Sequence, residues 1–327
     1  MIGARTLTCT LALALAILAG ACSDRSAARA GRNLRIGLIA DSSSIPGPQA
    51  TYAGALAAAR ELGTAHGVEV AIEWQVREAA GQGHAVVDLA RGGARGILVA
   101  ASEPERITAA IDEAAELGAA VVCIDSDVPG SRRFAFMGTD DEAWGRTLVG
   151  ELSLALRRHG TIGVLAGDPT RARSQARMRG VLDELTRHPG LRLHPEGVIH
   201  HGESPGEAAG ALARAHGALA EVDGWAMVGG WPLLAPGPLP WEPGAVKAVA
   251  VGALPEQLAH LEGGYVDVLL AEDCFGWGYR SVELLIDKLV DGFDPVGGPR
   301  LVDPPTRLTR ADAEGFAALW RSWVKVP

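Results

Sequence analysis

Short apolar runs alternate with amphipathic segments along most of the chain. The runs end in clusters of Gly, Pro, Ser or Asp, which is typical of strands, and the segments between them have helical periodicity. In the first part of the chain, strands are expected at 34–40, 68–76, 96–101 and 121–124, with helices at 49–62, 84–91 and 103–117. Strand–helix units at this spacing predict a parallel, doubly wound sheet.

The same order of elements begins again after Asp141. Strands are expected at 161–166, 191–201, 224–229, 246–251 and 265–270. Helices are expected at 142–159, 174–187, 205–219 and 255–261, and two later helices end at 290 and 324. The segment 231–244 is an exception, because its five prolines exclude a regular helix. The pattern as a whole predicts an α/β protein with two similar lobes.

A polar turn lies between the two halves of this pattern. The strand 121–124 leads into Asp125, Ser126 and Asp127, and a short strand at 133–137 leads into 138–141. Open α/β sheets bind ligands beyond the carboxyl ends of their strands. We therefore expect Asp125 to contact a ligand, the alternative being a turn cap, and 138–141 to carry the chain from one lobe to the next.

The first 33 residues have the features of a targeting segment. Arg5 precedes an apolar stretch from Leu7 to Leu18, and small residues lead to Cys22. This arrangement resembles a bacterial lipoprotein signal, so we expect 1–21 to be a signal peptide, Cys22 a lipid anchor and 22–33 a tether. Plain secretion, with Cys22 incidental, is the alternative. Both place the mature protein outside the cytoplasm, in the periplasm or cell envelope.

Composition narrows the choice of partners. The chain has 327 residues, 48% of them hydrophobic, and a formal net charge of −9 with no clustered Lys/Arg face, which argues against a nucleic-acid partner. Beyond the targeting segment only Cys123 and Cys274 remain. A disulfide is possible in this compartment, but two buried free thiols are the expected arrangement.

Several segments together carry a resemblance to a known family. They are IGLIADSSS, VVCIDSDVPGSRRFAFMGTDDEAWG, SQARMRG, VDGWAMVGGWPL and AEDCFGWGYRSVELLIDKLVDG. In order and spacing they resemble the type 1 periplasmic binding proteins of sugar transporters, the ribose-binding group, from about Leu34 to Val324. The resemblance implies two doubly wound parallel-sheet lobes, 34–139 plus 273–301 and 140–272 plus 302–327, joined by a three-segment hinge and closing on one sugar.

The resemblance also implies roles for individual residues. Asp125 matches a sugar-hydroxyl acceptor, Arg177 an arginine that donates to sugar oxygens, and Glu272 a hinge glutamine that contacts the ligand. Ser126 stands where the ribose binder has an arginine. The chain departs from the family at three places: first-loop aromatics align with Gly47 and Pro48, an asparagine with Gly229, and an aspartate with Gly252.

Further binding candidates come from their place at strand ends. Asp41 and Ser43 follow the first strand and are expected on the same rim as Asp125. Trp231 follows a strand end in a Gly-Gly context and is the best candidate to stack on the apolar face of a sugar. The competing interpretation is that sugar binding has been lost and that Trp231 fills the core of the second lobe.

Other chemistry has little support in the sequence. Strand alternation puts His194 and His200 on one face and His201 on the other, and no Cys or Glu completes a metal-ligand set, so we expect no metal or cofactor. We expect no enzyme; catalysis through Asp125 and Glu272 is a remote alternative. The sequence thus predicts a monomeric, lipid-anchored solute-binding protein that captures a monosaccharide or sugar-like polyol by lobe closure and delivers it to an ABC permease. A ligand-sensing subunit of a membrane receptor is the alternative.

Overall fold

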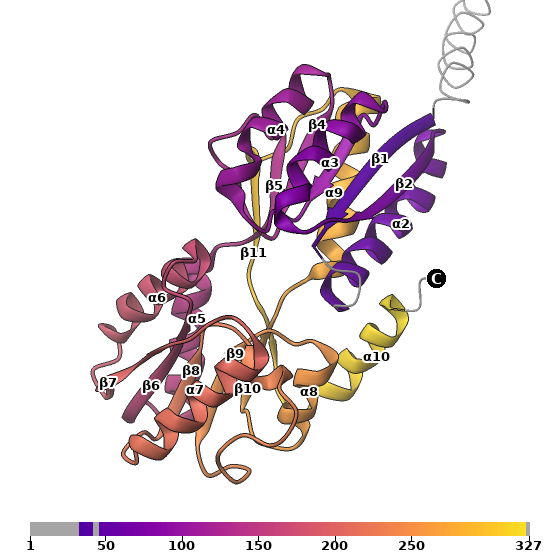
Figure 1. The fold of residues 1–327 in the computed structure, drawn as a ribbon. Coiled ribbons are helices and arrows are strands. Elements are labelled where there is room, and N and C mark those ends of the chain that lie inside the picture. The colour runs from indigo at the N-terminus through magenta and orange to yellow at the C-terminus, as the bar shows by residue number, and fades with distance from the viewer. Residues whose placement is uncertain (1–32, 42–45, 325–327) are drawn as a thin grey trace, which may run out of the picture. The chain divides into compact units, whose positions relative to one another are not determined.

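The computed structural model describes residues 33–41 and 46–324. The expected signal peptide, the anchor Cys22 and the binding candidate Ser43 lie outside these ranges. The described chain divides into two compact units. Of the described residues, the first holds 33–41, Tyr52–Phe136 and Gly278–Pro299, and the second holds 46–51, Met137–Trp277 and 300–324. Figure 1 labels most of the helices and strands of both units.

Most strands of the first sheet alternate with helices along the chain. Its strands are β1 (Asn33–Ala40), β2 (Glu69–Val76), β3 (Gly96–Val99), β4 (Ala120–Ile124), β5 (Ala135–Thr139) and β11 (Arg300–Asp303). The helices between and after them are α2 (Pro46–His66), α3 (Ala79–Arg91), α4 (Pro104–Glu116), α9 (Cys274–Ile286) and the π-helical turn η2 (Asp287–Asp291). In space the strands follow the order β11-β5-β4-β3-β1-β2.

The second sheet repeats this arrangement. Its strands are β6 (Gly160–Gly167), β7 (Leu191–His200), β8 (Gly224–Met227), β9 (Lys247–Val251), β10 (Val268–Ala271) and β12 (Thr306–Leu308). The accompanying helices are α5 (Asp141–Ala155), α6 (Ala172–Leu185), α7 (Pro205–Ala218), α8 (Pro255–Glu262), α10 (Ala313–Trp323) and the 3-10 turn η1 (Trp231–Leu234). The strand order is β12-β10-β9-β8-β6-β7, and β12 pairs antiparallel with β10.

Both sheets contain a point at which the strand order reverses. In the first sheet β1 pairs in parallel with both β2 and β3, and in the second β6 pairs in parallel with both β7 and β8. The connections on the two sides of such a strand run to opposite faces, which leaves a crevice at the carboxyl ends of the strands. The switch points β1/β3 and β6/β8 are therefore the places at which a ligand site is expected in each unit.

Each of the two units has its own hydrophobic core. In the first, apolar side chains of α3 and α4 pack on β1, β3 and β4, with Val86, Ile97 and Val121 fully buried. In the second, α5 packs on β6, β8, β9 and β10, with Leu148 and Val164 fully buried. The predicted fold of two doubly wound α/β lobes is confirmed. Cys123 and Cys274 are free and buried, which confirms that interpretation as well.

The structure departs from the predicted elements mainly at helix ends, and the proline-rich segment forms no regular helix, as predicted. The helix expected from 84 begins at Ala79, because the two glycines in its first turns lower helix propensity without preventing the helix. The proline-rich segment begins with the turn η1, and its Trp241 is buried, with Nε1 donating to the carbonyl of Tyr265 at 3.0 Å. Among the described residues, no helix combines the length and apolarity needed to span a membrane.

Candidate functional site

Asp125 occupies a strained turn at the carboxyl end of β4. Its φ is 67°, in the left-handed region that non-glycine residues seldom adopt, and the amide of Ser126 donates to the carbonyl of Ile124 at 2.7 Å. The result is a three-residue turn with Asp125 at its centre. The neighbouring Asp127 pairs with Arg133 instead, whose Nη2 donates to Oδ2 at 3.0 Å. Strain held in place beside a strand end is characteristic of ligand-contacting positions.

The switch point of the first sheet carries a second polar group. Asp41 directly follows β1 and is exposed. Across the switch, the side chain of Gln82 on α3 donates to the carbonyl of Ala100 at 2.9 Å and accepts from the amide of Ser102 at 3.0 Å. Gln82 is 2% exposed, so these bonds fix the loop after β3. The sequence analysis did not single out Gln82, because only the tertiary fold places it at that loop.

In the second unit, two glycines let α5 and α6 approach each other closely. A Cβ on Gly145 would lie 1.9 Å from the carbonyl oxygen of Arg177, and one on Gly180 would lie 1.9 Å from that of Glu142. Neither position can hold a larger residue without separating the helices. The close crossing sets the first turns of α6 beside the first residue of α5, and it thereby places Arg177 next to Asp141.

Four charged residues meet at this crossing. Arg177 Nε donates to Asp141 Oδ1 at 2.8 Å, and its Nη2 donates to Glu272 Oε1 at 3.2 Å. Arg173, one helical turn earlier, donates through Nε to Asp141 Oδ1 at 3.3 Å and through Nη2 to Glu272 Oε1 at 3.0 Å. Each carboxylate thus presents one oxygen to both guanidinium groups. We call Asp141, Arg173, Arg177 and Glu272 the charge cluster.

The members of the charge cluster differ in their access to solvent. Arg177 has a side chain only 6% exposed; Nη1 also donates to the carbonyl of Val228 at 2.7 Å, and its guanidinium lies over the ring of Trp144 at 5.7 Å. The side chains of Arg173 and Glu272 are 28% and 24% exposed. Arg177 therefore anchors the cluster from within, while Arg173 and Glu272 face solvent. Sequence reasoning missed Arg173, although the i, i+4 spacing of the two arginines puts both on one helix face.

The ionisation of Asp141 follows from its partners. Burial alone would raise the pKa of its carboxyl. The positive charges of Arg173 and Arg177, together with a hydrogen bond from Thr139 Oγ1 at 3.0 Å, outweigh burial and hold the pKa below its ordinary value of 3.8. The N-terminus of α5 favours the same charged form. Asp141 is therefore a carboxylate at neutral pH. The sequence analysis had treated it only as part of a connecting segment.

Two tryptophans brace the segments that carry the charge cluster. The indole of Trp144 on α5 donates to the backbone carbonyl of Asp303 at 3.0 Å, and the indole of Trp277 on α9 donates to the carboxylate of the same residue at 2.9 Å. Both rings are almost fully buried. Asp303 thus ties the start of α5 to the start of α9, close in the sequence to Asp141 and Glu272. These tryptophans are packing residues.

Trp231 lies at the switch point of the second sheet. A Cβ on Gly229 would be 2.1 Å from Cζ3 of its indole, and one on Gly167, the last residue of β6, would be 3.3 Å away. The indole therefore rests on the backbone at the ends of β6 and β8. Its other neighbour is His201, whose ring meets it edge-on at 5.6 Å. Trp231 is half-buried, so it both packs on the core and presents surface to solvent.

At the end of β9, the side chain of Gln257 fills the space that a ligand could otherwise enter. Gly252, with φ 114°, stands next to Gln257, whose Nε2 donates to the carbonyl of Gly230 at 2.8 Å and whose Oε1 accepts from the amide of Leu254 at 2.7 Å. Gln257 is 3% exposed, so it ties the loop after β9 to the loop after β8. On the same loop, Trp320 of α10 donates to the carbonyl of Ala253 at 2.7 Å. Gly230 therefore makes room for Gln257, whereas Gly229 makes room for Trp231.

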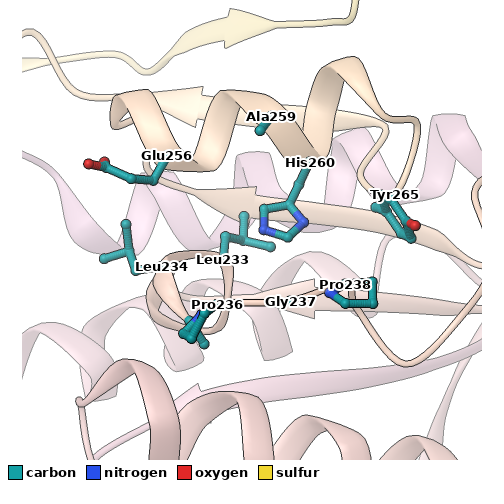
Figure 2. A pocket seen from close by; sticks show the side chains of 10 residues that line it. Leu233, Leu234, Pro236, Gly237, Pro238, Glu256, Ala259, His260 and Tyr265 are labelled. Carbon is teal, nitrogen blue, oxygen red and sulfur yellow. The ribbon is translucent and has the colours of Figure 1, made fainter.

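One cavity of the second unit is separate from these residues. It has a volume of about 480 Å³, lies between the proline-rich segment and α8, and is lined by Leu233, Leu234, Ala235, Pro236, Gly237, Pro238, Glu256, Ala259, His260 and Tyr265. Figure 2 shows His260 pointing from α8 toward Leu233. Burial lowers the pKa of His260, although a hydrogen bond with the backbone of Leu233 opposes this effect. The lining is mainly apolar and contains no predicted binding residue.

One group of side chains in the described part of the chain has metal-ligand geometry. His66, Asp287 and Asp291 have ligand atoms that all lie within 4.8 Å of one another, and His66 Nδ1 is 2.9 Å from Asp291 Oδ2. The contact between His66 and Asp291 accounts for the closeness of two of these three groups. This group is far in the sequence from the strand ends of both switch points, and it contains none of the histidines considered in the sequence.

Comparison with known proteins agrees with this geometry. The model of the periplasmic binding protein domain family matches residues 36–292. No curated protein matches significantly. An arabinose-binding protein from Geobacillus stearothermophilus is 21% identical, with a TM-score of 0.75, over 87% of this chain and 99% of that one.

Two further solved structures have the same fold. A solute-binding protein from Burkholderia graminis C4D1M, in complex with D-arabinose, is 20% identical, with a TM-score of 0.72, over 86% of this chain and 96% of that one. A periplasmic ribose ABC transporter protein from Conexibacter woesei DSM 14684 is 16% identical, with a TM-score of 0.74, over 90% and 97%. With the family match over most of its length, this chain belongs to the periplasmic binding protein domain family.

Proposed function

We propose that the protein is an extracytoplasmic solute-binding protein that captures a monosaccharide or sugar-like polyol and delivers it to an ABC permease. The observation that carries the proposal is the pairing of Trp231 with the charge cluster in the second unit. A half-buried indole lies at the switch point of the sheet, and the carboxylate of Glu272 and the guanidinium of Arg173 face solvent in the same unit. A sugar needs both, because it presents an apolar ring face and dense hydroxyl groups.

The first unit contributes a complementary set. Asp125 is held in a strained turn at the end of β4, and Asp41 follows β1 at the switch point. Carboxylates accept hydrogen bonds from sugar hydroxyls, so these two residues and Ser126 are the proposed contacts from the first unit, and Ser43 remains a prediction from the sequence. The relatives support the class of ligand, since two of them are described as arabinose-binding or arabinose-bound and a third as a ribose transporter protein.

The test is a binding assay with purified protein and a panel of aldopentoses and aldohexoses. We expect one or more to bind with micromolar or better affinity, to perturb tryptophan fluorescence, and to be recovered unchanged, which distinguishes binding from turnover. Trp231→Ala should remove the fluorescence change and at least ~1 kcal/mol of affinity. Trp323→Ala, on the C-terminal helix, is the matched control. Loss of thermal stability in Trp231→Ala with intact affinity would make Trp231 a core residue only.

Asp125 provides a second test of the same proposal. Asp125→Ala should weaken binding by about 2–4 kcal/mol, because it leaves sugar hydroxyls without their acceptor in a site closed to water. Ligand should also decrease the radius of gyration measured by small-angle scattering, since the proposed capture involves closure of the two lobes. Losses below about 0.5 kcal/mol for Asp125→Ala would place the binding site elsewhere.

Export and anchoring belong to the same proposal. The small residues before Cys22 and the polar segment after it support a lipid anchor in the cell envelope. Cys22→Ala should release the protein from the membrane fraction into the soluble envelope fraction. If the unsubstituted protein is equally soluble, it is secreted without an anchor.

A further inference from the structure

The charge cluster is electrically balanced without any ligand. Two guanidinium groups and two carboxylates form four ion pairs, with N–O distances from 2.8 to 3.3 Å. Asp141 and Glu272 each use one oxygen to reach both arginines. The two positive charges that an acidic ligand would need as partners are therefore already neutralised within the protein.

The exposed fractions of the four side chains decide which of them a ligand can contact. Asp141 and Arg177 have side chains 17% and 6% exposed, so they form the inner half of the cluster. Arg173 and Glu272, the more exposed half, form one ion pair of their own at 3.0 Å. A ligand hydroxyl can donate to Glu272 and accept from Arg173 without altering the charge of either. A ligand carboxylate or phosphate would compete with Glu272 for Arg173.

Acidic side chains lie on the same side of the second sheet as well, and the positive charges of Arg171 and His200 act on one of them, Asp168. The indole of Trp231 rests on Gly167, and next to it Ser174 Oγ donates to Glu203 Oε1 at 2.8 Å. Glu203 adds a negative charge on the same side of the second sheet. Asp168, in the loop after β6, adds another, and hydrogen bonds from the amide and hydroxyl of Thr170 lower the pKa of its carboxyl.

We infer that the charge cluster makes the site selective for neutral, polyhydroxylated ligands and excludes acidic sugars such as uronates and sugar phosphates. The inference rests on the proposed function, since it specifies the class of sugar that this site takes. The physical reason is that an anion adds a net negative charge to a partly buried cluster with a net charge of zero. In such a place an unbalanced charge is costly, whereas a neutral hydroxyl is not.

The experiment compares matched neutral and acidic ligands by calorimetry. The pairs are D-galactose with D-galacturonate, D-glucose with D-glucuronate, and D-ribose with D-ribose 5-phosphate. For any pair whose neutral member binds, we expect the acidic member to bind at least 100-fold more weakly. Glu272→Gln, which removes one negative charge and keeps the side-chain shape, should shift this ratio toward the acidic member by at least 10-fold. Asp141→Asn is the second variant should Glu272→Gln fail to fold.

Glu142→Gln is the matched control. It makes the same change of charge on α5, where Glu142 pairs with Arg146 at 3.0 Å on a 43% exposed side chain. It should leave the ratio within twofold of the unsubstituted protein. Equal affinity for both members of a pair, or an unchanged ratio in Glu272→Gln, would overturn the inference while sugar binding itself stands. Failure of every monosaccharide to bind would overturn the proposed function and this inference with it.

Discussion

Replacing Arg177 by alanine should destabilise the second unit strongly. The guanidinium is almost fully buried, and it donates to Asp141, Glu272 and the carbonyl of Val228. Alanine leaves the Val228 carbonyl without this donor, which costs about 1–3 kcal/mol when the acceptor is buried. It also removes one of the two cations from each carboxylate, and the cation–π contact with Trp144, worth about 1–2 kcal/mol when desolvated.

These contributions are not additive, because Arg173 remains beside both carboxylates. We therefore expect the free energy of unfolding to fall by about 3–5 kcal/mol, the range observed when one partner of a buried ion pair is removed. Arg173→Ala is the matched comparison. It removes the same charge from the same two carboxylates, but from a 28% exposed side chain, so its cost should be about 1 kcal/mol or less.

Urea denaturation followed by far-ultraviolet circular dichroism measures both variants without relying on tryptophan fluorescence, which the loss of a charge above Trp144 would itself change. The transition of each variant is fitted with the slope of the unsubstituted protein as reference, so that a loss of two-state behaviour is detected. If Arg177→Ala costs no more than Arg173→Ala, burial of the guanidinium does not stabilise the crossing of α5 and α6, and the reasoning fails.

Three further predictions follow from other positions. The pKa of Asp141 is lowered in the folded state, so its contribution to stability is present above the ordinary value of 3.8 and is lost as pH falls below it. In urea denaturation, the difference in free energy of unfolding between the unsubstituted protein and Asp141→Asn should be constant from about pH 5 to 7 and should shrink toward pH 2. Gly229→Ala should reproduce the affinity loss of Trp231→Ala in calorimetry, since a Cβ would displace the indole, while Gly206→Ala, with open space around it, should not. Burial raises the pKa of the Cys123 thiol to about 12, so a disulfide reagent should modify Cys123 only as fast as the protein unfolds; rapid modification of the folded protein would contradict its burial.

The fold could be predicted in nearly all its elements because most of its strands are apolar and bounded by strong turn residues. The run Val121–Ile124 is predicted within one residue of β4, and the proline-rich segment is correctly excluded from a regular helix. Errors fall where local signals conflict with tertiary packing. The strand expected from Tyr265 begins at Val268, because Tyr265 belongs to the turn after α8.

The candidate site was harder to predict, because its contacts join residues far apart in the chain. A strand end and a glycine pair were sufficient to select Trp231, whose position at the switch point supports the selection. Nothing local indicates that Asp141 shares both arginines with Glu272, which is 131 positions later. The position of Gln257 beside the end of β9 also depends on tertiary structure. The glycine at 252 indicates only that there is no room for a larger side chain, and does not identify the residue that fills the space.

The way in which the two units divide the sequence has a consequence for biosynthesis. The first unit begins near the N-terminus, yet it includes Gly278–Pro299, which are translated after most of the second unit. A nascent chain that has emerged as far as residue 136 lacks the end of α9 and the edge strand β11, and its apolar sheet edge is still uncovered. The first unit therefore cannot reach its complete structure until the last sixth of the polypeptide has been made. Until then its unpaired strand edge is open to pairing with strands of other chains.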